Sequence, residues 1–187
     1  MPPKVRITKE EIVNAAFGIV RERGASAVNA RTVASVLDCS TQPIFSNFAT
    51  MGELRLAVVE KADRVYQEYT RRETEQGKYP PYKASGMAYI RFAKEEKELF
   101  KLLFMRDRTD EVISEETEFN KQIEQLVREN TGLEGNNTKL FHLEIWAFVH
   151  GIATMFATEY FDMGWELVSN MLTDAYQGLK KQFNAEN

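Results

Sequence analysis

Four polar side chains in one short run carry the clearest chemical signal in this sequence. They are Thr41, Gln42, Ser46 and Asn47. Gln and Asn amides can form paired hydrogen bonds with adenine, and Ser or Thr hydroxyls can bond several bases. On an exposed helix, these residue types could read base edges in the major groove of duplex DNA. The competing interpretation is an ordinary polar surface on a small helical bundle.

Helix signals precede this run. Thr8 and Glu11 form a capping-box pattern ahead of apolar residues at helical spacing, and Gly24 is expected to end that helix in a left-handed conformation. A second helix is expected after Asn29. Asp38 then stands at a turn, where a short polar side chain tolerates a positive φ.

The helix that carries the polar run needs a start signal of its own. We expect Ser40 to cap it, and Pro43 fits its first turn because N–H groups there have no intrahelical partner. Thr50 and Glu53 repeat the capping-box pattern and open a fourth helix. Short helices on either side of a tight turn are typical of a helix-turn-helix, whose second helix enters the major groove.

Three runs of residues follow one another in a distinctive order. They are an apolar stripe from Ile12 to Gly24, the segment Val33–Ala34 with Leu37–Asp38–Cys39–Ser40, and the segment Ile44–Phe45 with Asn47–Phe48 and Glu53–Leu54. Their order and spacing resemble the N-terminal domain of TetR/AcrR-type transcriptional repressors. Residues 146–151 and 89–104 resemble a C-terminal domain from the branch that carries a Trp…His-Gly motif. Such proteins usually have Gly, Tyr and His where this chain has Asp38, Phe45 and Asn47.

The resemblance implies an all-α protein, with a three-helix helix-turn-helix DNA-binding domain in residues 1–54 and a helical regulatory and dimerisation domain in residues 55–187. It implies a homodimeric repressor that binds a palindromic operator and is released by a small molecule bound in the C-terminal domain. Residues expected to contact DNA are Lys4, Arg6, Asn29, Arg31, Thr41, Gln42, Pro43, Phe45, Ser46, Asn47, Thr50 and Met51. A Tyr hydroxyl can bond a phosphate and the Phe45 side chain cannot, so this chain is expected to lack that hydrogen bond.

Charge is unevenly distributed along the chain. The whole sequence has a formal net charge of −4, but residues 1–48 carry +2 and the remainder −6. This asymmetry has the direction that a DNA-binding head requires. Residues 40–50 carry no charge, so phosphate attraction would depend on Lys4, Arg6, Arg31 and helix N-termini. We therefore expect DNA affinity to need two heads acting together.

The rest of the chain shows no strand alternation and no hairpin signal, which again predicts an all-α fold. Helices are predicted at residues 51–76, 84–93, 95–105, 114–130 and 140–160 and from residue 165, with breaks at 77–82 and 131–137. The last two are strongly apolar, and pairing them with their copies in a second subunit would bury them. The interface is expected at Phe148, Ile152, Trp165, Val168, Leu172, Tyr176 and Leu179, with Leu167 and Met171 beside that stripe.

Aromatic and Met residues in the C-terminal part suggest a pocket for a small, apolar effector. The candidates are Phe92, Phe100, Phe104, Met105, Phe119, Trp146, His150, Met155 and Phe156. For each of them singly, ordinary core is the competing interpretation. His142 and His150 share a helix stripe, but two His residues without a nearby Cys do not favour a metal site, and no cofactor is expected.

Composition argues against several other classes of protein. With 43% apolar and 11% aromatic residues, the chain is not expected to be disordered. No apolar run approaches the ~18 residues of a membrane span, and the first ten residues lack the core of a signal peptide. The single Cys39 fits a reducing cytoplasm.

No catalytic motif is found in the sequence, so an enzyme is not expected. There is no phosphate-cradling Gly loop, no Gly-x-Ser-x-Gly and no suggestive Cys/His dyad. The alternative to a repressor is a helical small-molecule sensor with weak or lost DNA binding. The uncharged polar run motivates that alternative, as do Phe45 and Asn47 in place of the usual Tyr and His.

Overall fold

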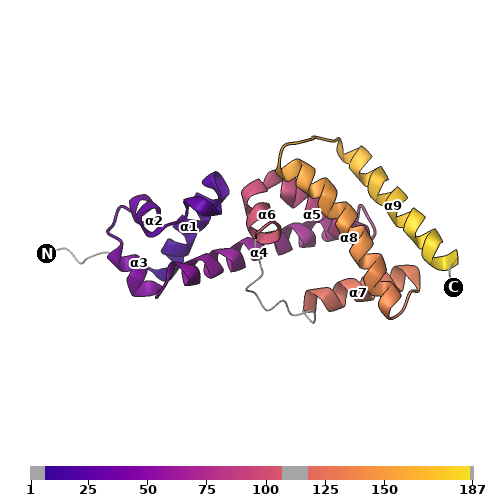
Figure 1. Cartoon of the computed structure of the whole chain (residues 1–187), viewed down its shortest axis with the longest axis horizontal. Coiled ribbons are helices and arrows are strands. Elements are labelled where there is room, and N and C mark those ends of the chain that lie inside the picture. Colours follow the sequence, from indigo (N-terminus) through magenta and orange to yellow (C-terminus); the bar gives the residue numbers. More distant parts are fainter. Residues whose placement is uncertain (1–6, 107–117, 186–187) are drawn as a thin grey trace. The chain divides into compact units, whose positions relative to one another are not determined.

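The computed structural model describes residues 7–106 and 118–185, with side chains for residues 7–106 and 121–184 (Figure 1). The described residues form helices and turns, and no strand is found among them. The elements are α1 (Lys9–Arg23), the 3-10 turn η1 (Ala25–Ala27), α2 (Ala30–Val36), α3 (Gln42–Asn47), α4 (Met51–Glu75), α5 (Pro81–Glu95), α6 (Lys97–Phe104), α7 (Glu118–Thr131), α8 (Asn136–Ala157) and α9 (Trp165–Ala185). The predicted all-α class is confirmed.

The chain divides into two compact units. The first takes in the chain up to Gln67 together with Glu96–Arg106, and so contains α1–α3, the first part of α4, and α6. The second takes in Glu68–Glu95 and the chain from α7 onward. These units do not follow the boundary predicted at residue 54, because α4 continues without a break and α6 packs against α1.

Local capping determines where the first two helices start. Thr8 Oγ1 accepts a hydrogen bond from Glu11 N–H at 3.2 Å, and the Glu11 carboxylate accepts one from Thr8 N–H at 2.8 Å. Asn29 Oδ1 accepts from the N–H groups of Arg31 and Thr32 at 3.0 and 3.1 Å. These bonds satisfy N–H groups that have no partner inside the helix. Both predicted starts are confirmed.

The turns on either side of α2 were predicted better than the start of α3. Gly24 ends α1 with a φ of 81°, and Asp38 has a φ of 48°, as its place in the turn predicted. The predicted cap at Ser40 is wrong. Thr41 is the residue before α3, and its φ of −72° and ψ of −13° are already helical. A capping side chain needs an extended backbone to reach the helix N–H groups, so α3 starts without such a bond.

The first unit has a core formed by the helices of the turn motif. Ile12 on α1, Val33 on α2 and Ile44 on α3 are all fully buried. The segment that starts α6 is attached to α1 by an ion pair, in which the Arg21 guanidinium donates to both oxygens of Glu96, with Nε 2.7 Å from Oε2. Glu96 is only 5% exposed, so this pair fastens α6 to the helix-turn-helix.

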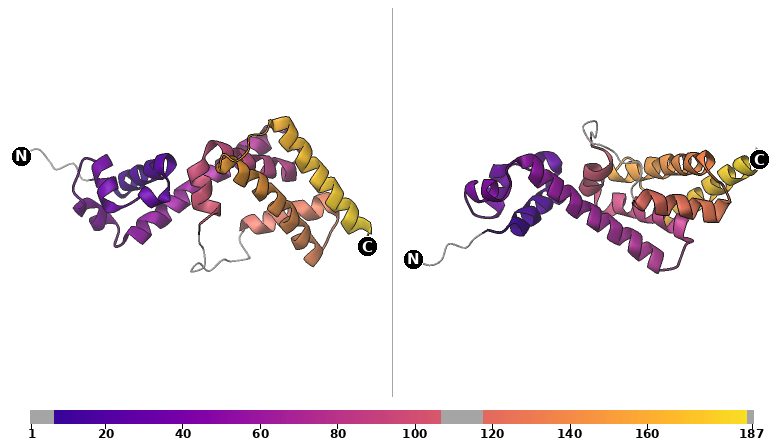
Figure 2. Two further views of the ribbon diagram at one scale, coloured as in Figure 1. Left: turned by 45° about the horizontal axis from the view of Figure 1, so that its top comes forward. Right: turned by 90° about the horizontal axis from the view of Figure 1, so that it is seen from below.

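The second unit is organised around α5, which packs on α7, α8 and α9 (Figure 2). Helix α5 begins at Pro81, earlier than predicted. Proline is accepted at a first helical position because an N–H there would have no partner within the helix. The buried cluster that joins these helices contains Tyr82, Ile123, Val127, Leu133, Phe141 and Phe183. Gly86 allows α5 to approach α9, since a Cβ there would lie 3.2 Å from Leu172 Cδ2.

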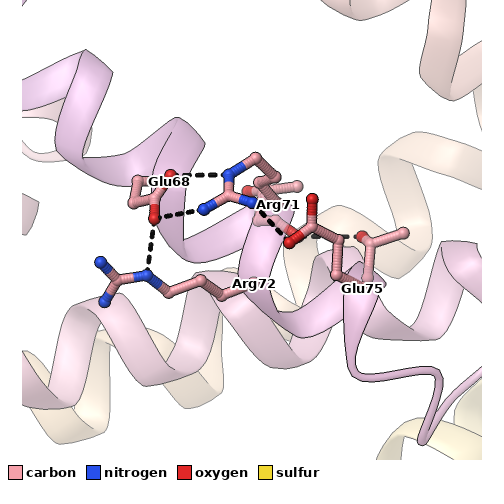
Figure 3. A network of polar contacts seen from close by, with 6 residues as sticks. Glu68, Arg71, Arg72 and Glu75 are labelled. Atoms are coloured by element: carbon pink, nitrogen blue, oxygen red, sulfur yellow. Dashed lines mark hydrogen bonds and ion pairs between the residues drawn. The ribbon is translucent and has the colours of Figure 1, made fainter.

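The end of α4 within the second unit carries a ladder of ion pairs. Glu68 accepts hydrogen bonds from Arg71 and Arg72, each at 2.7 Å, and Arg71 also pairs with Glu75 (Figure 3). The two guanidinium groups lower the pKa of Glu68 to about 2. Both arginines and Glu75 are exposed, so water weakens these pairs and the ladder supports the helix end only modestly.

The remaining helices lie close to their predicted ranges. The helix predicted at 95–105 is α6, and the part of the helix predicted at 114–130 that precedes Glu118 lies outside the described residues. The loop predicted at 131–137 is shorter because α8 starts at Asn136.

The most apolar helix of the described chain is α8. By length and composition alone it could cross a membrane, which the sequence analysis did not anticipate. The core helix of a soluble protein has the same properties, and 33% of the most apolar window of α8 is buried. Its exposed large apolar side chains are Leu140, Leu143, Trp146, Phe148 and Met155. One face of α8 is therefore uncovered by the described residues.

Candidate nucleic-acid interface

The two sides of α3 differ sharply. Ile44 is fully buried and Phe48, directly after the helix, is 2% exposed, so these two side chains seat α3 on the rest of the unit. Gln42, Phe45 and Ser46 are exposed. Positions three and four apart lie on one face of a helix, so these three residues form a single outward face, here called the α3 face. Phe45 is 52% exposed, and its side chain has no polar atom.

Asn47 lies away from the α3 face. Its side-chain Nδ2 donates to the main-chain oxygen of Pro43 at 2.8 Å and to that of Ile7 at 3.4 Å. The second bond joins α3 to the residue that precedes the first helix cap. In the free protein the amide of Asn47 therefore holds two segments together, whereas the sequence placed it among the base-contacting residues.

Three other polar residues predicted to contact DNA, namely Ser46, Asn29 and Thr50, are also engaged locally. The Ser46 hydroxyl donates to the main-chain oxygen of Gln42 at 2.9 Å. Asn29 caps α2, as described above, and Thr50 Oγ1 accepts from Glu53 N–H at 3.2 Å at the start of α4. A hydroxyl that donates one bond can still accept another, so these roles leave Ser46 able to meet a ligand.

The remaining predicted DNA contacts are placed as follows. Arg31 is exposed near the start of α2, and Thr41, Pro43 and Met51 are half-buried. Lys4 and Arg6 lie outside the described residues. Within the described part of the first unit, no cationic side chain belongs to the α3 face.

An open cleft of about 540 Å³ lies between α1 and α4 in the first unit. Lys9, Lys61 and Arg64 line it together with the carboxylates of Glu10 and Glu60. Opposite charges are thus interleaved around this cleft, and Lys61 is already bonded to Asn14. A cleft of this kind favours neither an anionic nor a cationic ligand.

The predicted effector residues fall into both units. Phe100, Phe104 and Met105 belong to the first unit, and Phe92, Trp146, His150, Met155 and Phe156 to the second, whereas the side chain of Phe119 lies outside the described part. Phe92 and Phe100 are fully buried, as core residues would be. Trp146 is 42% exposed and stacks on the His150 ring at a centroid distance of 5.1 Å, which presents a flat aromatic surface.

Two Tyr–His pairs between α5 and α8 were not found by sequence reasoning. The Tyr82 hydroxyl lies 3.0 Å from His142 Nδ1, and the Tyr89 hydroxyl lies 2.8 Å from His150 Nδ1. Burial lowers the pKa of both histidines, and the nearby carboxylate of Glu124 partly opposes this for His142. The two tyrosines are seven residues apart and the two histidines eight, so members of each pair lie on similar faces of their helices. The pairing could not be predicted from this spacing because the register of α5 against α8 is not known from the sequence.

The residues predicted for the dimer interface are mostly engaged within their own protomer. Ile152, Val168 and Leu172 are 3%, 0% and 7% exposed. Trp165 stacks against Phe156 of α8. Tyr176, which with Leu179 packs against the buried cluster, donates to the main-chain oxygen of Asn130 at 3.1 Å. Among the predicted set, Phe148 is the large apolar residue that stays exposed, at 38%.

The outward stripe on the last helices is therefore a different one. On α8 it contains Leu140, Leu143, Ala147, Phe148, Gly151 and Met155, which recur at helical spacing and are all exposed. On α9 Leu167 is 51% exposed. We call the α8 residues together with Leu167 the outer stripe. Along it, Glu144 Oε2 and Thr154 Oγ1 are buried without a hydrogen-bond partner among the described residues.

The arrangement defines an all-helical protein whose N-terminal helix-turn-helix is followed by a helical bundle. Residues 82–175 match the family model described as "Tetracyclin repressor-like, C-terminal domain". The chain therefore belongs to the TetR family of transcriptional regulators, as the resemblance predicted. Its placement in the branch with a Trp…His-Gly motif stays a prediction. The comparison with curated proteins finds no match.

Proposed function

We propose that the chain is a homodimeric, ligand-responsive transcriptional repressor of the cytoplasm that binds a palindromic operator through α3. The observation that carries this proposal is the α3 face: Gln42, Phe45 and Ser46 are exposed together on a helix seated by Ile44 and Phe48. A helix held in this way can enter a major groove with defined side chains outward. The family match over residues 82–175 supports a regulator with DNA as its partner.

The outer stripe supports a two-fold dimer. Its large apolar side chains surround Ala147 and Gly151, and a Cβ at Gly151 would meet no atom within 4 Å. Two copies could bring their stripes together closely at these small residues, which would bury the apolar side chains. The proposed interface thus replaces the one predicted around Val168 and Leu172.

A dimer gives the DNA-reading geometry. Two α3 helices must meet successive turns of the major groove, about 34–36 Å apart. A small molecule bound in the second unit releases the operator if it binds better to a conformation with another spacing. A coupling of roughly 1–3 kcal/mol is sufficient for such regulation. The exposed Trp146–His150 stack is the part of the predicted effector set best placed to receive a flat, mainly apolar ligand.

The test uses the purified full-length protein and the duplex upstream of its own coding region. Sedimentation velocity establishes the oligomeric state, and fluorescence anisotropy measures DNA binding as the salt concentration is raised. We expect a dimer that binds with a steep salt dependence. A monomer at micromolar concentration would contradict the proposal.

One observation favours a second function. The α3 face has no charged residue, and residues 40–50 as a whole have none. A helical sensor with weak or lost DNA binding would have the same dimer and the same effector response. A confirmed dimer that binds no DNA at low salt, in the upstream duplex or in a randomised duplex library, would select this alternative.

A further inference from the structure

We infer that the α3 face reads an A·T base pair, with Phe45 against the thymine methyl group and Gln42 on the adenine. This inference rests on the proposed function, since it names the base pair that the proposed DNA contact selects. It assigns a positive role to the aromatic residue that appeared to be only the loss of a phosphate contact.

The exposure of Phe45 follows from the way α3 packs. Ile44 and Phe48 are buried on the opposite side, so the packing of α3 directs Phe45 outward at 52% exposure. A phenyl ring cannot hydrogen-bond a phosphate or a base edge, and apolar contact is the interaction it offers. On the major-groove edges of the bases, the thymine C5-methyl is the apolar group that a Phe side chain can contact.

The neighbouring polar residue points to the same base pair. Adenine presents its N7 acceptor and N6 donor in the major groove, and the amide of an exposed Gln can bond both. Gln42 lies three residues before Phe45 on the α3 face. Side chains at this spacing have Cβ atoms about 5–6 Å apart, which matches one or two base-pair steps of about 3.4 Å. Gln42 and Phe45 can therefore reach the same A·T pair or adjacent ones.

The other polar residues of the helix add no contact that favours a G·C pair. The amide of Asn47 is bonded to Pro43 and Ile7, and the Ser46 hydroxyl, which donates to Gln42, can still accept from adenine or cytosine alike. Because α3 carries no charge, it has no Arg or Lys to select guanine. The chemistry available on this face thus matches A·T pairs better than G·C pairs.

The experiment first selects bound duplexes from a library with a randomised centre, using the full-length protein. In the selected sequence, each thymine is then replaced by deoxyuridine, which removes the methyl group and leaves the hydrogen-bonding edge unchanged. We expect the replacement at one position of each half-site to weaken binding about fourfold per methyl group, and about fifteenfold when both half-sites are changed.

Three variants make this a test of Phe45 itself. Phe45→Ala should bind the thymine duplex more weakly and lose its sensitivity to deoxyuridine at that position. Phe45→Leu, which keeps an apolar contact, should retain part of that sensitivity. Leu56→Ala is the matched control, because it removes an apolar side chain that is 58% exposed on α4, outside the α3 face, and it should respond to deoxyuridine as the unmodified protein does. Circular dichroism and thermal unfolding confirm that each variant is folded.

The outcomes separate the inference from the proposed function. If a dimer enriches no sequence, the proposed function fails. If a sequence is enriched but deoxyuridine changes nothing, or changes Phe45→Ala and the unmodified protein equally, the inference is overturned and the repressor stands. Should Phe45→Ala fail to fold, the deoxyuridine series with the unmodified protein and with Phe45→Leu still decides.

Discussion

The α3 face and the outer stripe both expose large apolar side chains, and they differ in what surrounds those side chains. On α3, Phe45 stands between the polar residues Gln42 and Ser46. On α8, Leu143 and Phe148 belong to a stripe in which apolar residues follow one another for most of the helix. A mixed surface suits a duplex groove, which offers polar edges and isolated methyl groups, whereas a continuous stripe suits another apolar stripe. The neighbours of an exposed apolar residue therefore indicate its partner better than its exposure does.

Breaking the outer stripe should have the largest effect. Leu143 and Phe148 are 57% and 38% exposed, so replacing both by Glu should leave the protomer folded and place four like charges across the two-fold axis. We expect monomers by sedimentation velocity and a loss of DNA affinity of about 100-fold or more, because the second head no longer adds to the first.

Leu56→Glu is the matched control for this experiment. Leu56 is 58% exposed on α4, outside the outer stripe, and the added charge there should leave the dimer intact. A dimer that survives Leu143→Glu with Phe148→Glu would show that the interface lies elsewhere.

Leu172 should behave in the opposite way to the outer stripe. It is 7% exposed, and its Cδ2 lies against Gly86, so Leu172→Ala leaves a cavity inside the protomer. We expect a loss of about 2–5 kcal/mol in the free energy of unfolding by urea titration. The folded fraction should still dimerise. Unchanged stability combined with monomers would restore the interface that the sequence analysis predicted.

On the α3 face, Gln42→Ala should change which sequence is bound. Removing an amide that bonds adenine costs about 1–3 kcal/mol of discrimination against the wrong base. Competition between the selected duplex and single-base variants should show relaxed preference at one position in each half-site. Preference that stays intact at every position would remove Gln42 from base readout.

Asn47→Ala should have a smaller and less selective effect. Its amide links Pro43 and Ile7, so the variant loosens the segment before α1 and lowers affinity by a similar factor for every duplex. Unchanged ratios between duplexes, with uniformly weaker binding, would identify Asn47 as a positioning residue. A shift in preference at one base would return it to the reading face.

Signals that act within a few residues were sufficient to predict much of the first unit. The starts of α1 and α2 follow from Thr8 with Glu11 and from Asn29, because a cap bonds N–H groups of its own helix. The start of α3 was predicted wrongly because no side-chain cap bond holds that short helix. It is held instead by the packing of Ile44 and Phe48, which a local pattern does not reveal. Local sequence patterns were thus sufficient to predict the helices of this unit. The exposed side of α3 could be assigned once its buried residues were known.

The second unit was harder to predict because its choices depend on contacts between distant helices. The last helix carries apolar residues on more than one side, and the sequence does not reveal which of them face the protomer's own core. Val168 belongs to the inward stripe and Leu167, its neighbour, to the outward one. The Tyr–His pairs have the same origin, since Tyr82 meets His142 only through the register of α5 on α8.

The smallest predicted effect concerns these Tyr–His pairs and the pH. Burial lowers the pKa of His142 and His150 from 6.5, so the fold favours the neutral rings. The Nδ1 atom of each neutral ring can accept a hydrogen bond from the Tyr hydroxyl, and the Nδ1–H of a protonated ring cannot accept one. The stability that the pairs contribute is therefore complete above the unfolded pKa of 6.5 and falls as the pH decreases below it.

The free energy of unfolding should accordingly decrease between pH 7 and pH 5, and the decrease should be shallower when both histidines are replaced by Gln. The chain contains 2 His, so the double variant has none, and any pH dependence that remains comes from groups other than histidine. Equal slopes for the two proteins would show that α5 and α8 hold together without these pairs. A steeper decrease of the unfolding free energy with falling pH in the unmodified protein would show that the two Tyr–His pairs contribute to stability. The apolar outer stripe has no group that titrates between pH 5 and pH 7, so it would not produce this difference.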